Sequence, residues 1–180
     1  MTTKTSRPKR TNAEVYSPSS RKEVAKALKR ATIYYLSKKM YSCHEEFGVG
    51  DWGNKRLDLL AMNTKCVFIG VEIKSCPSDY RTDTKWIDYL NTGVFHKFYF
   101  CITMKMQQNK KFFKTLCNDL KPHGVGIMVL GEYGRIKVVK SAKTREVNNE
   151  ALQRVIIKMA WRGGESKRTI KQTKRVYIEE

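Results

Sequence analysis

RLDLLAMNTKCVFIGVEIKS, residues 56–75, reads as two β-strands joined by a tight connection, and the rest of the chain is organised around this hairpin. Strand side chains alternate between two faces, so the second strand presents branched aliphatic side chains on one face only. These are Val67, Ile69, Val71 and Ile73. The other face carries Phe68, Gly70, Glu72 and Lys74. An acid and a lysine therefore share one face at the end of this strand.

A second acid, Asp58, lies near the start of the first strand, residues 57–62. In an antiparallel pair the start of one strand lies beside the end of the next, so Asp58 can meet Glu72, with Lys74 close by. Carboxylates are hard oxygen ligands for Mg²⁺ or Mn²⁺, and a lysine beside such an ion can position water. The three side chains suit phosphodiester hydrolysis. The alternative is a surface strand with a solvated acid and a salt-bridged lysine, because a lone E-x-K is common.

The length of the hairpin connection decides whether Asp58 shares that face. A two-residue connection, Asn63–Thr64, would place Asp58 opposite Ile69, on the apolar face. A three-residue connection, Asn63–Lys65, or a bulge would place it opposite Gly70 and diagonal to the acid of the second strand. The functional interpretation therefore requires an odd connection or a bulge. Gly70 would then leave room for an ion between the carboxylates.

The composition indicates one strongly basic domain. The chain has 180 residues, enough to bury a core, and a formal charge of +19 from 36 basic and 17 acidic residues. Such a field attracts polyanions, either nucleic acid or an anionic membrane surface. No apolar run approaches the length of a membrane span and no signal peptide is visible, so we expect a soluble protein outside the membrane.

The cysteines indicate a reducing compartment. They are odd in number, form no C-x-x-C pair, and mostly lie in apolar segments: Cys43, Cys66, Cys76, Cys101 and Cys117. We interpret them as reduced thiols of a cytoplasmic protein. The three histidines have no ligand spacing with them, so we expect no zinc site.

Basic side chains gather in the first helix and at both ends of the chain. We expect a flexible basic arm over residues 1–18, a folded domain over residues 19–164 and a basic tail over residues 165–180. Ser20 and Glu23 form a capping box, and helical spacing then predicts a helix to about Lys38 with basic residues on its outer surface. Such charges can also be a merely solvated face. The candidate DNA contacts are Arg21, Lys22, Lys26, Lys29, Arg30, Lys85, Lys167, Arg168, Lys171, Lys174 and Arg175.

The other segments predict alternating strands and helices. Residues 40–47 form a strand in which Glu45 or Glu46 is either an extra acid of the site or an exposed strand end. After the hairpin, Cys76-Pro77-Ser78 interrupts the pattern. There follow a helix from Asp83 to near Gly93, a strand Lys97–Thr103, a helix Asn109–Leu120, a hairpin of Val125–Leu130 with Ile136–Val139, and a helix Asn149–Trp161 with Leu152, Val155, Ile156 and Met159 inward.

This order, αβββαβ, together with Asp58, Glu72 and Lys74, resembles the PD-(D/E)XK nuclease superfamily. More closely, the chain resembles the MmcB-like DNA repair protein family. The likeness rests on RLDLLAM, VEIKS, SDYRTDTKWIDY and KFYFCIT, and extends through GIMVLGEYGRI and the last helix, about residues 20–162. It implies a restriction-endonuclease-like α/β core, a mixed central β-sheet flanked by helices.

The resemblance also implies roles for particular residues. Asp58, Glu72 and Lys74 would be the catalytic core, with the two acids as metal ligands. Leu57 stands where the superfamily name has a proline, which is often missing. The supplementary acid would be Glu46, with Glu45 and Glu23 as alternatives. For Asp79, Asp83, Lys85 and Tyr89 the resemblance implies proximity to the site without a defined role.

We therefore expect a Mg²⁺- or Mn²⁺-dependent deoxyribonuclease, an endonuclease in DNA repair or recombination. DNA is the expected partner, with no small-molecule cofactor. A Holliday-junction resolvase, commonly a homodimer, is the alternative within enzymes. A DNA-binding module that kept the fold and lost the chemistry is the alternative outside them, and a membrane-surface or RNA-binding protein is a third.

Overall fold

The structure, a computed structural model, describes residues 20–50 and 56–163. The predicted arm, residues 1–18, and the predicted tail, residues 165–180, lie outside the described residues. In chain order the elements are α1 (Arg21–Ser37), β1 (Tyr41–Gly48), β2 (Arg56–Asn63), β3 (Phe68–Lys74), α2 (Pro77–Thr82), α3 (Lys85–Asn91), β4 (Lys97–Thr103), α4 (Met104–Gln108), α5 (Lys110–Leu120), β5 (Gly126–Leu130), the 3-10 turn η1 (Glu132–Gly134), β6 (Ile136–Lys140) and α6 (Asn149–Gly163).

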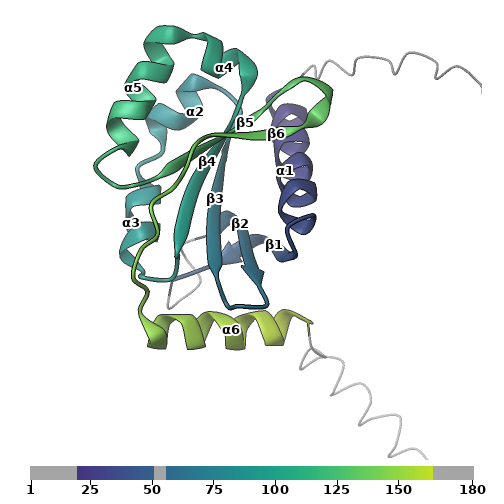
Figure 1. Cartoon of the computed structure of the whole chain (residues 1–180), viewed down its shortest axis with the longest axis vertical. Coiled ribbons are helices and arrows are strands. Elements are labelled where there is room, and N and C mark those ends of the chain that lie inside the picture. Colours follow the sequence, from purple (N-terminus) through teal and green to yellow (C-terminus); the bar gives the residue numbers. More distant parts are fainter. Residues whose placement is uncertain (1–19, 51–55, 164–180) are drawn as a thin grey trace, which may run out of the picture.

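The strands of the described chain form one mixed, open sheet in which spatial order follows sequence order, β1 to β6 (Figure 1). β1, β2 and β3 are antiparallel neighbours. β3, β4 and β5 run parallel, and β6 returns antiparallel to β5. The α/β class, with helices flanking a mixed sheet, is as the sequence predicts.

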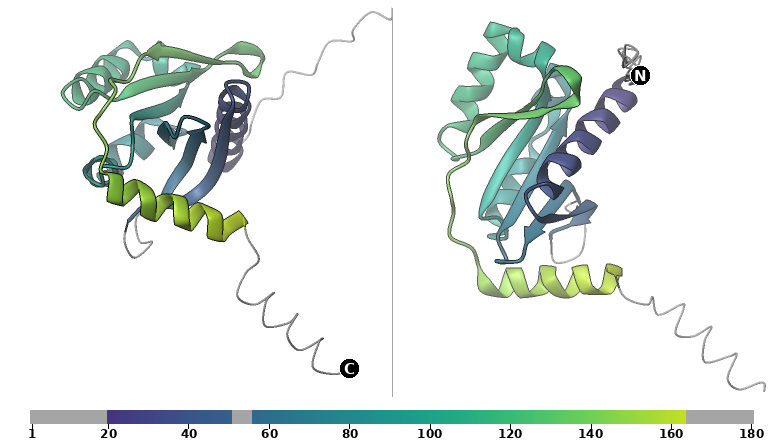
Figure 2. Two further views of the ribbon diagram at one scale, coloured as in Figure 1. Left: turned by 60° about the horizontal axis from the view of Figure 1, so that its bottom comes forward. Right: turned by 45° about the vertical axis from the view of Figure 1, so that its right-hand side comes forward.

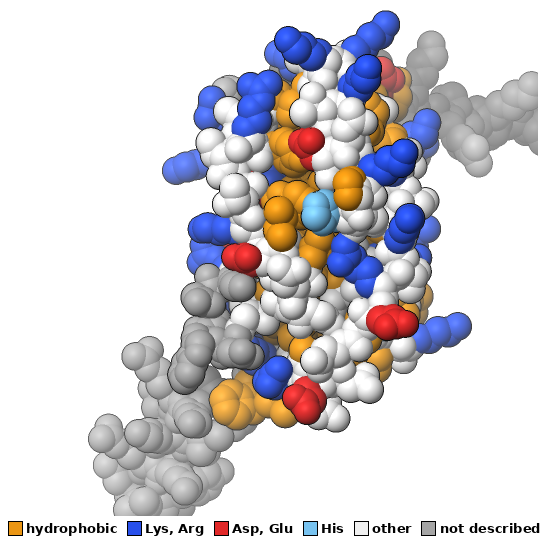
Figure 3. All heavy atoms as spheres, turned by 90° about the vertical axis from the view of Figure 1, so that its left-hand side faces the viewer, with side chains coloured by type: hydrophobic (Ala, Val, Ile, Leu, Met, Phe, Trp, Pro, Cys, Tyr) orange, Lys and Arg blue, Asp and Glu red, His pale blue; other side chains and the backbone are white. Residues whose placement is uncertain are grey.

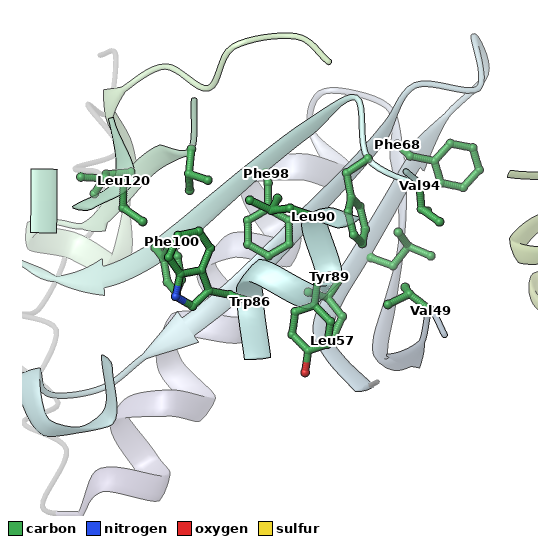
Figure 4. Packing of buried hydrophobic residues seen from close by; sticks show 14 of the residues in the cluster. Val49, Leu57, Phe68, Trp86, Tyr89, Leu90, Val94, Phe98, Phe100 and Leu120 are labelled. Atoms are coloured by element: carbon green, nitrogen blue, oxygen red, sulfur yellow. The ribbon is translucent and has the colours of Figure 1, made fainter. Parts of the chain in front are cut away.

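Helices cover both faces of the sheet. α1 lies on one face, α2, α3 and α5 lie on the other, and α6 closes one end of the molecule (Figures 1 and 2). Under α1, Leu28 and Leu36 pack with Leu59, Val71 and Ile73 of the hairpin. On the opposite face, Trp86, Tyr89 and Leu90 of α3 point toward Phe98, Phe100 and Leu57 (Figure 4). Because the side chains of β2 and β3 alternate between the two faces of the sheet, these strands contribute to a hydrophobic core on each face.

The first helix begins as its sequence predicts. The Ser20 side chain accepts from the backbone N–H of Glu23, and the Ser20 N–H donates to the Glu23 carboxylate, each at 3.2 Å. The buried line is Leu28, Thr32 and Leu36. Tyr34, which shares the helical repeat of the sequence, is instead 61% exposed. The fully buried residues of the helix therefore follow an i, i+4 stripe, and Val24, Ala25, Ile33 and Tyr35 pack beside it partly buried.

The hairpin connection has odd length, as the functional interpretation requires, but it is displaced by one residue. Leu59 pairs with Val71, which makes the connection Thr64–Cys66. Asn63 fixes it, because its side-chain oxygen accepts from the N–H of Lys65 and of Val67, both at 3.0 Å. Cys66 has φ 54°, so the connection is a turn completed by a left-handed residue.

This register corrects the predicted surroundings of Asp58. Extending the pairing by one residue sets Asp58 opposite Glu72, whereas Gly70 pairs with Leu60. A Cβ on Gly70 would lie 2.7 Å from the Phe98 ring and 2.9 Å from the Phe95 ring. The glycine therefore makes room for two phenylalanines of the core. The expectation that it leaves space for an ion was wrong.

Two short helices were absent from the sequence prediction. Pro77 begins α2, because proline fits the first helical position, where its missing N–H costs nothing. Asp83 ends α2, so α3 begins at Lys85, later than predicted. α4 follows β4 directly. In α6 the buried residues include Val155 and Met159, but Ile156 is 38% exposed and does not face inward as expected.

Candidate active site

Asp58 and Glu72 lie where the backbone pairing of β2 and β3 gives way to bonds from side chains. The paired residues run from Met62–Phe68 to Leu59–Val71. Next to them, the Ile73 N–H donates to Asp58 Oδ2 at 2.7 Å, and the Asp58 N–H donates to Glu72 Oε1 at 3.3 Å. Each carboxylate thus bonds to the backbone of the other strand. The hairpin brings the two predicted acids together at one junction.

Lys74 joins the same cluster and brings a fourth side chain with it. Its Nζ lies 3.2 Å from Glu72 Oε2 and 2.5 Å from Asp83 Oδ2. Asp83 comes from the connection between α2 and α3, and its Oδ1 accepts from the Lys85 N–H at 2.9 Å. Glu72 is 5% exposed and Lys74 is 4% exposed. Two acids, Glu72 and Asp83, therefore hold the Lys74 ammonium in a nearly buried site, and Asp58 lies beside Glu72.

Burial and mutual charge shift the protonation of this cluster. Burial, and then the negative charge of Asp58, raise the pKa of Glu72 to about 8. Burial also raises the pKa of Asp58, against the opposing bond from the Ile73 N–H. For Lys74, burial lowers the pKa, but the charges of Glu72 and Asp83 outweigh it and the pKa is raised. The cluster therefore favours a charged lysine and disfavours two ionised acids side by side.

A third acid, Glu46, lies on the neighbouring strand β1. Glu45 pairs with Leu59 and Phe47 pairs with Leu57, which sets Glu46 opposite Asp58. Glu46 has φ 48°, a left-handed backbone that is unusual inside a strand and is often found at functional sites. Arg162 of α6 donates to the carbonyls of Glu45 and Glu46, each at 3.0 Å. Glu46, Asp58 and Glu72 form what we call the acidic row.

Among the predicted supplementary acids, the register favours Glu46. Glu45 has a side chain that is 56% exposed, and Glu23 is occupied in the helix cap of α1. Glu46 is bonded by Lys29 Nζ at 2.5 Å and by Arg56 Nε at 3.0 Å. A role for Glu46 in catalysis stays a prediction.

Lys29 is one predicted DNA contact that the structure places elsewhere. Its side chain is only 18% exposed and reaches Glu46 and Glu45 from α1, so it does not lie on the outer surface as expected. Helical geometry explains this, because Lys29 follows the buried Leu28 and lies at the edge of the buried stripe. The exposed candidates in the described chain are Arg21, Lys22, Lys26, Arg30 and Lys85. Lys167, Arg168, Lys171, Lys174 and Arg175 lie outside the described residues.

Tyr89 and Asp79 support the edges of the site. The Tyr89 hydroxyl donates to the Arg56 carbonyl at 3.0 Å, which ties α3 to the start of β2. Burial, and then the charges of Glu72 and Asp83, raise the pKa of Tyr89 to about 12. Asp79 accepts from the Ser75 N–H at 3.0 Å, just beyond Lys74. The proximity implied for these residues by the D-Y-x-x-D-x-K-W-x-D-Y run is therefore observed, and Asp83 is in direct contact.

Two features are absent from residues 20–50 and 56–163. This part of the chain contains no helix long and apolar enough to cross a membrane. It also contains no group of three or more histidine, cysteine or acidic side chains placed to hold a metal ion. Metal binding by Asp58 and Glu72 stays a prediction.

The fold and site define an α/β protein with two acids and a lysine at the junction of its central hairpin. The chain belongs to the MmcB-like family of DNA repair proteins, whose model, described as "DNA repair protein MmcB-like", matches residues 12–172. No curated protein matches the sequence.

The solved structures that resemble the chain include the following two. SPO1766, a protein of unknown function from Silicibacter pomeroyi, is 20% identical with a TM-score of 0.61, over 76% of this chain and 83% of its own. An XisH family protein from Nostoc punctiforme PCC 73102 is 16% identical with a TM-score of 0.46, over 68% of this chain and 99% of its own. The first likeness supports the fold.

Proposed function

We propose that this chain is a metal-dependent DNA nuclease of the PD-(D/E)XK type, an endonuclease acting in DNA repair or recombination. The observation that carries the proposal is the junction itself. Asp58, Glu72 and Lys74 come from two strands, yet the Asp58 N–H donates to Glu72 Oε1 at 3.3 Å and Lys74 Nζ donates to Glu72 Oε2 at 3.2 Å. The Asp58 carboxylate is held beside them by the Ile73 N–H at 2.7 Å. Membership of a DNA repair family and the +19 formal charge support DNA as the substrate.

The donor set fits Mg²⁺ or Mn²⁺. Both side chains offer carboxylate oxygens, and Mg²⁺ is commonly held by one or two carboxylates together with water and substrate phosphate. Burial, and then the charge of Asp58, raise the pKa of Glu72, so a divalent cation would relieve the cost of two ionised acids at this junction. Bound there, the metal would lower the pKa of a water molecule and neutralise charge on the phosphate.

The residues of the site would then have separate roles in binding and catalysis. Asp58 and Glu72 are held by backbone N–H groups and by Lys74, so their oxygens are oriented before DNA arrives. The Lys74 ammonium, kept charged by Glu72 and Asp83, would position water and stabilise negative charge on the phosphate. Asp83 would hold that ammonium in place.

One observation favours the silent DNA-binding module as a second candidate. Glu72 and Lys74 are 5% and 4% exposed, and the Lys74 ammonium already forms a salt bridge with Asp83. A structural ion-pair network would have the same appearance. The two proposals differ in whether the wild-type protein cuts DNA in the presence of Mg²⁺ or Mn²⁺.

The test is a cleavage assay on single-stranded, duplex, flapped and four-way DNA, with either metal and with chelator. We expect wild type to cut at least one substrate, and Glu72→Gln to lose cleavage because an amide is a poor ligand for a hard dication. Glu72→Gln should still bind DNA in chelator. Glu132→Gln, an exposed acid on η1, is the matched control. Equal cutting by wild type and Glu72→Gln would remove this junction as the active site.

A further inference from the structure

A hollow of about 560 Å³ lies between α2, α3 and α5, beside the candidate active site. Its walls include Trp86, His123, Thr115 and Asp119, and Asp83 stands at one side. The same Asp83 contacts Lys74 at 2.5 Å. A ligand in the hollow would therefore be separated from the catalytic lysine by a single side chain.

Aromatic rings form part of this wall. The rings of Trp86 and His123 meet edge to face, with centroids 5.1 Å apart, and Trp86 packs in the same way on Phe100 at 5.6 Å. Trp86 is 6% exposed and is held by the core, whereas His123 is exposed at the rim. Figure 3 shows this side of the molecule, where hydrophobic side chains surround a histidine and basic side chains lie around them. Such surfaces stack planar rings.

Polar groups and cations complete the lining. Asp119 accepts a hydrogen bond from the Tyr80 hydroxyl at 3.1 Å, which orients its carboxylate. Arg81 and Lys111 are exposed cations of the same hollow. A nucleobase matches this combination, because it offers a flat face for stacking and amino groups for a carboxylate, while its phosphates meet the cations. An apolar ligand would make no use of these polar groups.

We propose that the hollow receives one unstacked nucleobase of the DNA strand that the nuclease site binds. This inference rests on the proposed function, since it names the part of the substrate recognised next to the reaction centre. The volume lies within the range of about 300–1,000 Å³ that is usual for small-ligand sites. The protein would then favour DNA whose bases are unpaired or easily extruded, because a paired base remains in its stack.

The experiment is abasic scanning of a single-stranded oligonucleotide of about 12 nucleotides, the length scale of single-strand binding sites. Affinity is measured by fluorescence anisotropy in chelator, with one nucleotide at a time made abasic. The proteins are wild type, His123→Ala to remove the ring at the rim, and Thr115→Phe to fill the hollow. Asn118→Ala is the matched control, an exposed residue of α5 outside the hollow.

In wild type and Asn118→Ala, loss of the base at one position should weaken binding about tenfold or more. In His123→Ala and Thr115→Phe, the intact oligonucleotide should bind more weakly, and the same abasic site should cost nothing further. The proposal is overturned if no position is sensitive, if both variants keep the full abasic penalty, or if wild type binds no DNA. Thr115 is exposed, so the filled variant should fold even if His123→Ala does not.

This measurement is independent of cleavage. A protein that shows the abasic pattern and does not cut DNA would keep the hollow as a base site and refute the nuclease. A protein that cuts DNA without that pattern would keep the nuclease and refute the base site.

Discussion

Glu72 is a buried acid whose pKa is raised by its surroundings. Burial, and then the charge of Asp58, raise its pKa to about 8 in the folded protein, whereas the unfolded value is about 4.3. Between these pH values the folded chain binds one proton more than the unfolded chain. Its contribution to stability is therefore complete below about pH 4 and is lost as the pH rises through about 8.

Glu72→Gln should remove this pH dependence, because an amide has no proton to lose. In chelator, the free energy of unfolding of wild type should fall relative to the variant by a few kcal/mol between about pH 4 and pH 8. Urea unfolding across that range measures the difference. Glu132→Gln should show no such trend. A constant gap between wild type and Glu72→Gln would mean that Glu72 is ionised throughout.

For individual residues, the sequence predicts some contacts of the candidate site and does not predict others. Asp58, Glu72 and Lys74 could be placed together because an antiparallel hairpin brings the start of one strand beside the end of the next, although the predicted register was displaced. Asp83 could not be assigned its contact with Lys74, since it lies in a connection between two short helices whose path depends on tertiary packing. The inward turn of Lys29 depends in the same way on how α1 sits on the sheet.

Gly70 of β3 packs closely against phenylalanine rings. Its role can therefore be tested by adding one methyl group at this position. An added Cβ would lie 2.7 Å and 2.9 Å from the rings of Phe98 and Phe95. Gly70→Ala should therefore destabilise the fold by about 1–3 kcal/mol, the usual cost of overpacking. Gly131→Ala is the control, because its Cβ would meet its nearest neighbours at 3.4 and 3.5 Å. If Gly70→Ala weakened Mn²⁺ binding without lowering stability, the ion-cavity interpretation would return.

The outer face of α1 should contribute to DNA binding through charge alone. The double variant Lys26→Gln/Arg30→Gln removes two exposed cations, and it should make the slope of log K against log salt less negative by about 1–2. Lys29→Gln is the matched comparison on the same helix. Because Lys29 is bonded to Glu46, its loss should leave that slope unchanged and cost about 1 kcal/mol of stability. A reversed result would mean that Lys29 meets DNA and its neighbours do not.

Element prediction succeeded where segments were long and periodic. α1, α5, α6 and the strands of the central hairpin have clear apolar spacing and turn residues at their ends. α2 and α4 are single short turns whose formation depends on tertiary packing, and the same holds for the boundary at Asp83. The displaced connection Thr64–Cys66 depends on the side chain of Asn63, which strand alternation does not reveal.

Over the whole molecule, the net charge should govern how DNA is approached. The formal charge of +19 includes the basic segment at residues 165–180. Deleting this segment should make the salt slope less negative while leaving thermal unfolding of the domain unchanged, since contact with phosphate releases counterions. Binding measured from low to high salt, beside a melting curve, tests both. An unchanged slope would exclude the tail from the DNA-binding surface.

The hydrogen bonds from Arg162 of α6 to the backbone around Glu46 have a consequence for synthesis of the protein. Arg162 donates to the carbonyl of Glu45, a residue 117 positions earlier in the chain. The acidic row leaves the ribosome with its three strands, but the backbone bend at Glu46 gains this support only after α6 has been synthesised. A chain truncated before α6 would therefore contain Glu46, Asp58 and Glu72 but lack the hydrogen bonds from Arg162 to the backbone of β1. We expect the proposed nuclease site to be incomplete in the nascent chain until α6 is present.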